Sequence, residues 1–195
     1  MLNGKYHAAR RRFLRIVSGL GAAGLFTIKS SAAEDTTEPF AVLDKNNCID
    51  IGGRGAEILK TAHSLGLELE KKHGGCARCT VATLQRSIDF IPEDRGLLRA
   101  ASCLDGGATP TKEANCGAFT GSGIVIGWIC GTDTFGDTSL SHDLLHELHE
   151  RFESEYGSVL CSDVRTKVEK KCPELVARVS RWTADIILRQ FTNYS

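Results

Sequence analysis

One apolar stretch of helix length constrains the fold more than any other feature: "EANCGAFTGSGIVIGWICGTD", from Glu113 to Asp133. The first half of this stretch contains three residues that have no side chain: Gly117, Gly121 and Gly123. Glycine inside a helix costs roughly 1 kcal/mol relative to alanine, so several in one helix need a compensating interaction. Because small residues let backbones approach closely, we expect a second helix or a cofactor to pack directly against this segment.

The remaining segments repeat apolar residues at helical spacing and show no alternating strand pattern. Helices are predicted from residue 55 to the basic and glycine-rich 71–75, and then over 76–91, 93–104, 113–133, 141–157 and 174–191. Loops are predicted over 105–115 and 131–139, with a tight connection over 158–164. The expected fold class is all-α, a compact single-domain helical bundle.

The N-terminal 33 residues read as a processing segment rather than as part of the fold. The basic sequence "ARRRFLR" is typical of twin-arginine export, and a short glycine-bearing apolar run and small residues follow it. That run is too short for a stable membrane span. The alternatives are a basic amphipathic arm, or a retained anchor if the segment is not cleaved. The predicted division is a twin-arginine signal peptide over 1–33, an extended N-terminal segment over 34–54 and a helical cysteine-rich redox domain over 55–195.

Composition narrows the function classes. The chain has 24 Lys and Arg against 24 Asp and Glu, so its zero net charge gives no argument for a nucleic-acid partner. Eight cysteines in a chain of 195 residues are unusual, and an exported protein could use them for disulfides, for redox chemistry or for a metal. Because the twin-arginine route carries folded proteins that often hold a cofactor, the predicted periplasmic location favours a metal centre.

Four of these cysteines resemble a family of redox proteins named for the pattern C_GCAxxG_C_C. The matching order is Cys76-Ala77, then Cys-Gly-Ala-x-x-Gly from Cys116 to Gly121, then Cys161 after "FESEYGSVL" and Cys172 before the last helix. The resemblance covers roughly residues 55–191. It implies an all-helical redox protein with an iron–sulfur or similar centre. In the split-Soret cytochrome branch, which also carries twin-arginine signals, it implies a haem-bearing homodimer.

The chain departs from that cytochrome branch. Covalent haem c requires Cys-x-x-Cys-His, but the Cys76-x-x-Cys79 sequence is followed by Thr80. We therefore expect no haem c. The resemblance then implies an iron–sulfur cluster on four ligands: Cys76, Cys116, Cys161 and Cys172.

The residues themselves support a site of this kind. Cys76 and Cys116 lie at predicted helix starts, Cys172 precedes Pro173, and Cys161 lies in a predicted loop. Soft thiolate ligands suit iron–sulfur clusters, and a helix N-terminus favours the thiolate form. We expect the four thiols to converge at one end of the bundle.

Several alternatives remain open at the level of sequence. Cys76 and Cys79 could form the active pair of a thiol–disulfide oxidoreductase, and Cys79 could also serve as an alternate ligand. All eight cysteines could instead pair in a disulfide-stabilised, non-redox module, or four could bind zinc. Cys130 reads as a small buried hydrophobic residue.

A second group of metal-ligand side chains is His142, His146 and His149, which share one helix face at steps of four and three. These histidines could bind a metal or non-covalent haem, although a solvated face beside acidic residues explains them as well.

The sequence therefore predicts an electron carrier rather than an enzyme, exported to the periplasm and without a membrane span in its mature form. Its expected partners are a second redox protein and a second copy of itself, since the small-residue helix offers a close-packing surface.

Overall fold

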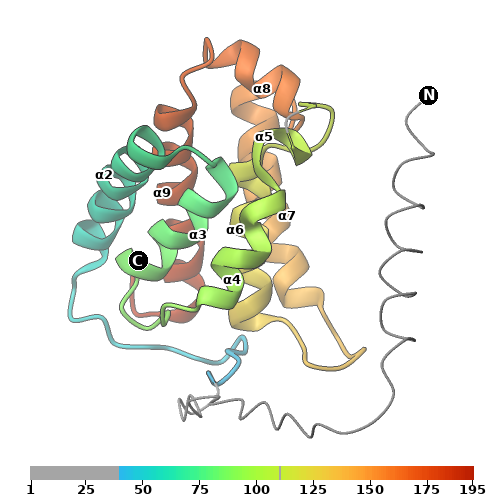
Figure 1. Cartoon of the computed structure of the whole chain (residues 1–195). Coiled ribbons are helices and arrows are strands. Elements are labelled where there is room, and N and C mark those ends of the chain that lie inside the picture. Colours follow the sequence, from blue (N-terminus) through green and yellow to red (C-terminus); the bar gives the residue numbers. More distant parts are fainter. Residues whose placement is uncertain (1–39, 110) are drawn as a thin grey trace, which may run out of the picture. The chain divides into compact units, whose positions relative to one another are not determined.

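The computed structural model describes residues 40–109 and 111–195, so the predicted signal peptide over 1–33 lies outside the described part. Within these ranges the regular secondary structure is helical, and β-pairing is limited to isolated bridges (Figure 1). The elements are α2 (Gly55–His73), α3 (Cys76–Ser87), α4 (Arg95–Ala100), the 3-10 turn η1 (Ala101–Cys103), α5 (Asp105–Ala108), α6 (Gly117–Cys130), α7 (Ser139–Tyr156), α8 (Cys161–Lys167) and α9 (Cys172–Phe191). The all-α prediction is confirmed.

Several predicted boundaries differ from the structure, including the loop predicted over 105–115, which contains α5, and the helix predicted over 113–133, which spans only Gly117–Cys130. Two further differences have a clear physical reason. Helix α3 ends at Ser87 and does not continue to Ile91, because Ile88 takes an extended conformation with its N–H still bonded to Leu84 O. The predicted tight connection over 158–164 contains the start of α8, whose Val164 is fully buried. A helix of seven residues with so few buried positions lacks the repeated spacing by which sequence patterns reveal helices.

Helices α2 and α9 pack closely at a glycine. A Cβ on Gly66 would lie 3.2 Å from the Cα of Ala177, so only a residue without a side chain fits this crossing comfortably. The chain that precedes α2 extends along the bundle. Leu43 N donates to Ile129 O at 2.7 Å, and Ile49 N donates to Phe191 O at 2.7 Å. These bonds connect the predicted extended segment to α6 and α9.

The glycine-rich helix α6 packs against α3. A Cβ on Gly121 would lie 2.6 Å from Ala77 O, and a Cβ on Gly117 would lie 2.4 Å from the Sγ of Cys76. Real Cβ atoms do not approach other atoms this closely, so the two glycines are required by the contact. This confirms the close approach expected from the sequence and identifies the neighbour as a helix of the same chain.

The core between these helices is apolar. Val81 and Leu84 of α3 and Leu148 and Phe152 of α7 are completely buried. The buried Ser122 hydroxyl lies 2.8 Å from the Thr183 hydroxyl, which joins α6 to α9 by a hydrogen bond. Buried polar groups that are paired in this way do not destabilise a core.

Among the described helices, none combines the length and the apolar character needed to cross a bilayer.

The α3–α6 contact gives a test with a matched control. We expect Gly121→Ala to lower the free energy of unfolding by about 1–3 kcal/mol, because the new methyl group meets Ala77 backbone that cannot move aside. Gly127→Ala in the same helix should raise it by roughly 0.5–1 kcal/mol, because no atom lies within 4 Å of the added Cβ. Urea unfolding of both variants measures the difference, and equal stabilities would contradict the close contact.

Candidate functional site

The four family-pattern cysteines all lie where helices begin. Cys76, Cys161 and Cys172 are the first residues of α3, α8 and α9, and Cys116 directly precedes α6. Figure 1 shows that α3, α6 and α9 run away from the end of the bundle at which α5 and α8 lie. Three of these helix-start positions were expected, and Cys161 is corrected from a loop to a helix start.

Backbone bonds connect the segments that carry two of these thiols. Cys116 N donates to Val159 O at 2.8 Å, and Cys161 N donates to Ala114 O at 3.0 Å. This reciprocal pair forms an isolated antiparallel bridge between Asn115 and Leu160. It holds Cys116 beside Cys161 although 44 residues of chain separate the two segments.

Two glycines bring further parts of the site into contact. A Cβ on Gly107, in the turn of α5, would lie 2.5 Å from the Cβ of Cys161. Gly117 brings the sulfur of Cys76 against the start of α6, next to Cys116. The contacts thus draw together Cys76, Cys116 and Cys161 from three separate helix starts.

Burial raises the pKa values of all four thiols. Burial is the largest contribution at each thiol. It raises the pKa of Cys76 to about 11 and that of Cys116 to about 12. It also raises the pKa of Cys161 and of Cys172. The thiols then act on one another. Negative charge on Cys76 or on Cys161 further raises the pKa of Cys116. In the same way, charge on Cys161 raises the pKa of Cys172, and charge on Cys172 raises the pKa of Cys76. Each of the four thiols therefore interacts electrostatically with two of the others. We call this group the cysteine ring: Cys76, Cys116, Cys161 and Cys172.

The helix start favours the thiolate form of Cys116, as expected, but burial outweighs this effect. The backbone N–H groups of Ala118 and Phe119, in the first turn of α6, do lower the pKa of Cys116. Their effect is smaller than that of burial, because only 2% of Cys116 is exposed. Without a positively charged ligand the thiols are held in the protonated form.

Hydrogen bonding separates these four thiols from three of the others. The off-pattern thiols donate to backbone carbonyls: Cys79 to Gly74 O at 3.3 Å, Cys103 to Ala100 O at 3.8 Å and Cys130 to Ile126 O at 3.1 Å. Within residues 40–109 and 111–195, the four family-pattern thiols donate to no acceptor. Backbone N–H groups instead favour charge on three of them: Gly106 on Cys76, the first turn of α6 on Cys116, and its own N–H on Cys172. Sulfur atoms that accept hydrogen bonds in this way are typical of metal ligands.

Cations lie on one side of the ring. Arg165 lowers the pKa of both Cys161 and Cys172, although burial raises these pKa values more, and Lys112 also lowers that of Cys161. On the other side, Glu70 and Asp105 add to the burial that raises the pKa of Cys76. Glu70 also raises the pKa of Cys172. The site is therefore more favourable to thiolate charge at Cys161 of α8 than at Cys76 of α3.

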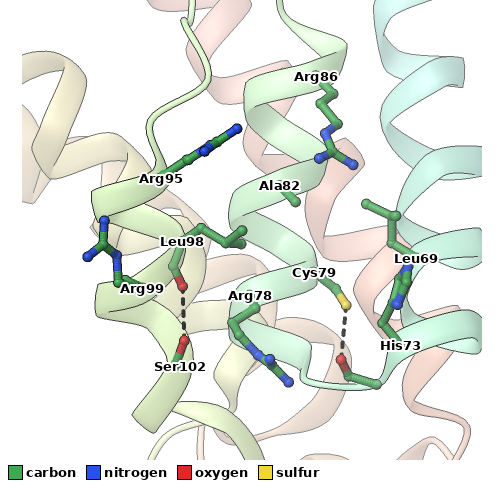
Figure 2. A pocket seen from close by; sticks show the side chains of 11 residues that line it. Leu69, His73, Arg78, Cys79, Ala82, Arg86, Arg95, Leu98, Arg99 and Ser102 are labelled. Carbon is green, nitrogen blue, oxygen red and sulfur yellow. Dashed lines mark hydrogen bonds between the residues drawn. The ribbon is translucent and has the colours of Figure 1, made fainter. Parts of the chain in front are cut away.

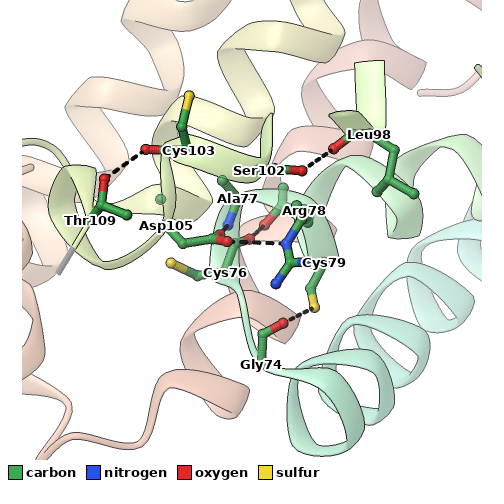
Figure 3. A network of polar contacts seen from close by, with 12 residues as sticks. Gly74, Cys76, Ala77, Arg78, Cys79, Leu98, Ser102, Cys103, Asp105 and Thr109 are labelled. Atoms are coloured by element: carbon green, nitrogen blue, oxygen red, sulfur yellow. Dashed lines mark hydrogen bonds and ion pairs between the residues drawn. The ribbon is translucent and has the colours of Figure 1, made fainter. Parts of the chain in front are cut away.

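Sequence reasoning missed Asp105, which caps α3 from a distant part of the chain. Its Oδ1 accepts a hydrogen bond from Ala77 N at 2.8 Å, and its Oδ2 accepts one from Arg78 Nε at 3.1 Å (Figure 3). A carboxylate at a helix N-terminus stabilises the helix through its exposed N–H groups. No local pattern could have revealed this role, because 28 residues separate Asp105 from Ala77.

Cys76 and Cys79 do not form a reactive pair in this structure. Their side chains point away from each other in Figure 3. Burial, and after it the Glu70 carboxyl group, raises the pKa of Cys79 to about 12. A thiol–disulfide oxidoreductase needs a thiol with a lowered pKa, so the structure gives this alternative no support. All eight cysteines of the chain lie in the described part and are free thiols there.

The predicted histidine group lies on α7 and pairs with that helix's own carboxylates. His146 lies 3.5 Å from Glu150, and His149 lies 3.8 Å from Glu153. The His146 and His149 rings stack with centroids 6.0 Å apart, and His142 is exposed. These contacts are those of a solvated helix face. Metal binding by these histidines stays a prediction.

Across residues 40–109 and 111–195, no three Cys, His, Asp or Glu side chains are arranged to hold a single metal ion. The described geometry therefore shows no preformed site for a single ion.

The raised thiol pKa values predict an alkaline loss of stability. The folded chain favours protonated Cys76 and Cys116, whereas the unfolded chain releases these protons near the ordinary value of 9.0. Their contribution is complete below about pH 9 and is lost as the pH rises to about 12. Urea unfolding of the reduced, chelator-treated chain should show this decrease, and Cys116→Ser should show less of it. An identical pH slope for both proteins would contradict the assignment.

Comparison with known proteins identifies the family of the chain. No curated protein matches the chain, and no solved structure does. Residues 75–186 match the family described as "Putative redox-active protein (C_GCAxxG_C_C)". The matched region contains all four ring cysteines, with Cys-Gly-Ala-x-x-Gly at residues 116–121 and the Gly-Cys-Ala order of the family label at residues 75–77. The chain belongs to the C_GCAxxG_C_C family of redox-active proteins.

Proposed function

We propose that this chain is an exported electron-transfer protein that holds one iron–sulfur cluster on Cys76, Cys116, Cys161 and Cys172. The observation that carries the proposal is the ring of four thiols, three buried and one, Cys172, half-buried. They come from four helix starts and donate no hydrogen bond to a described residue. Membership of a redox-active family supports the redox role.

The donor set suits a cluster better than a single zinc ion. Four thiols are soft ligands, which both iron–sulfur clusters and zinc accept. A zinc ion draws all its ligands to one point, whereas a cluster spreads its cysteines over several iron atoms that sulfide bridges hold together. Since no three described Cys, His, Asp or Glu side chains are arranged around one ion, the described geometry gives a zinc site no support.

The chain's residues would position the cluster and adjust its charge. When bound, a cluster supplies one-electron transfer. The N–H groups of Gly106, Ala118 and Phe119 favour charge on the ligand sulfurs, and Arg165 offsets negative charge at α8 and α9. Hydrogen bonds to sulfur and burial both determine the potential of such a centre. Because the thiols are protonated when unligated, loading the site releases protons and is favoured by higher pH.

Export through residues 1–33, a periplasmic location and a separate redox partner protein complete the proposal. A homodimer rests on the family resemblance alone. The sequence suggested a dimer contact through the small residues of α6. In the structure, Gly117 and Gly121 instead pack against α3 of the same chain.

Two buried cysteines of similar environment test the ligand set. We expect Cys116→Ala to abolish the cluster, because it removes a ring sulfur, and Cys130→Ala to retain it, because Cys130 donates to Ile126 O instead. Cys79→Ser should also retain the cluster. Anaerobic purification followed by an absorption spectrum and iron and sulfide analysis measures each outcome.

The wild-type protein provides the decisive control. A colourless, metal-free wild-type preparation with its thiols oxidised in pairs would overturn the proposal and favour a disulfide-stabilised module. Non-reducing mass spectrometry distinguishes that state from a reduced protein that has lost its cluster.

A further inference from the structure

A separate cavity of about 510 Å³ opens on the outer side of α3, between α2 and α4. Figure 2 shows Cys79 and Ala82 of α3 beneath it, Leu69 and His73 on the α2 side, and Leu98 on the α4 side. Its size lies within the range of small-molecule sites. The ring cysteines do not line it.

We call this cavity the groove. Apart from Cys79, the titratable residues that line it are all arginines or histidine. They are His73, Arg78, Arg86, Arg95 and Arg99, and no carboxylate belongs to the lining. Two of the arginines are already neutralised, since Arg78 lies 3.1 Å from Asp105 and Arg86 lies 3.2 Å from Glu93.

The two arginines of α4 differ from this pair. Both Arg95 and Arg99 are exposed, and within residues 40–109 and 111–195 neither forms an ion pair. The groove therefore offers two uncompensated positive charges. Besides Asp105 and Glu93, which pair with Arg78 and Arg86, the carboxyl group of Glu70 interacts with Cys79, and burial raises its pKa and so favours its neutral form.

The floor of the groove is apolar. Leu69 is buried, while Ala82 and Leu98 are partly buried and still present surface to the cavity. A ligand that covered them would remove apolar area from water, which stabilises the complex in proportion to the area. A simple inorganic anion would leave this surface exposed.

We propose that this groove binds a small organic anion of charge about −2 on an apolar body, either a phosphate ester or a dicarboxylate. The apolar body covers Leu69, Ala82 and Leu98, and Arg95 and Arg99 bind the anionic group. The planar guanidinium group bonds carboxylate and phosphate oxygens in pairs, so either anion suits it. This inference goes beyond the proposed electron transfer and does not depend on the cluster.

Isothermal titration of the full chain at low ionic strength and near neutral pH tests the proposal with four probes. Phenyl phosphate and phenylsuccinate carry both charge and an apolar body, whereas inorganic phosphate lacks the body and benzyl alcohol lacks the charge. We expect one of the two aromatic anions to bind, one molecule per chain, at least about tenfold more tightly than inorganic phosphate or benzyl alcohol. Which aromatic anion binds better identifies the phosphate ester or the dicarboxylate as the ligand class.

Variants assign the binding to the groove. Arg95→Ala/Arg99→Ala should weaken it by about tenfold or more, since hydrogen bonds to charged groups contribute at least this much. Arg181→Ala is the matched control, because Arg181 is an exposed arginine of α9 that lines a different cavity, and it should leave binding unchanged. Circular dichroism establishes folding, and the single Arg99→Ala variant replaces the double variant if that one unfolds.

Three results would overturn the proposal: no binding of either aromatic anion, equal binding of inorganic phosphate or benzyl alcohol, or equal weakening by the Arg181 control. Because the readout is heat of binding and not colour or iron content, failure here is distinct from failure of the iron–sulfur proposal.

Discussion

The contact between Ala77 and the two glycines of α6 is the constraint on which the site depends. Gly117 and Gly121 allow α3 and α6 to approach until backbone touches backbone. The residues at this contact are also the neighbours of the thiols, since Ala77 follows Cys76 and Gly117 follows Cys116. Helix packing and sulfur placement are therefore one geometric requirement. A larger side chain at either glycine would separate the helices and the two sulfurs together.

Burial dominates the chemistry of the cysteine ring. Two of its thiols have pKa values of about 11 and 12 although both lie at helix starts, because loss of hydration outweighs the helix N–H groups. Such thiols are poor nucleophiles near neutral pH, which agrees poorly with disulfide exchange and better with a ligand that replaces their protons. The redox role shown by the family is thus one that we assign to a bound centre rather than to the thiols themselves.

Helix α3 contributes to two separate places. Cys76 belongs to the ring, whereas Cys79, three residues later, borders the arginine-lined groove. Asp105 contacts both places, because it accepts a hydrogen bond from Ala77 N, next to Cys76, and pairs with Arg78, which lines the groove. The off-pattern cysteine is accordingly explained by packing and hydrogen bonding to Gly74 O, and not by a role as the partner of Cys76.

The sequence by itself determined the all-α class, the approximate positions of the main helices, and the four cysteines of the family pattern. Helical spacing and the order of short motifs are local properties, so they are readable without coordinates. Tertiary structure alone decided that Gly121 packs on Ala77, that Asp105 caps α3, and that the ring thiols are protonated. Each of these depends on segments far apart in the chain, and on burial, which no local pattern records. The short helix α8 was also decided by the tertiary structure, because the backbone hydrogen bond of Cys161 and the burial of Val164 hold it in place.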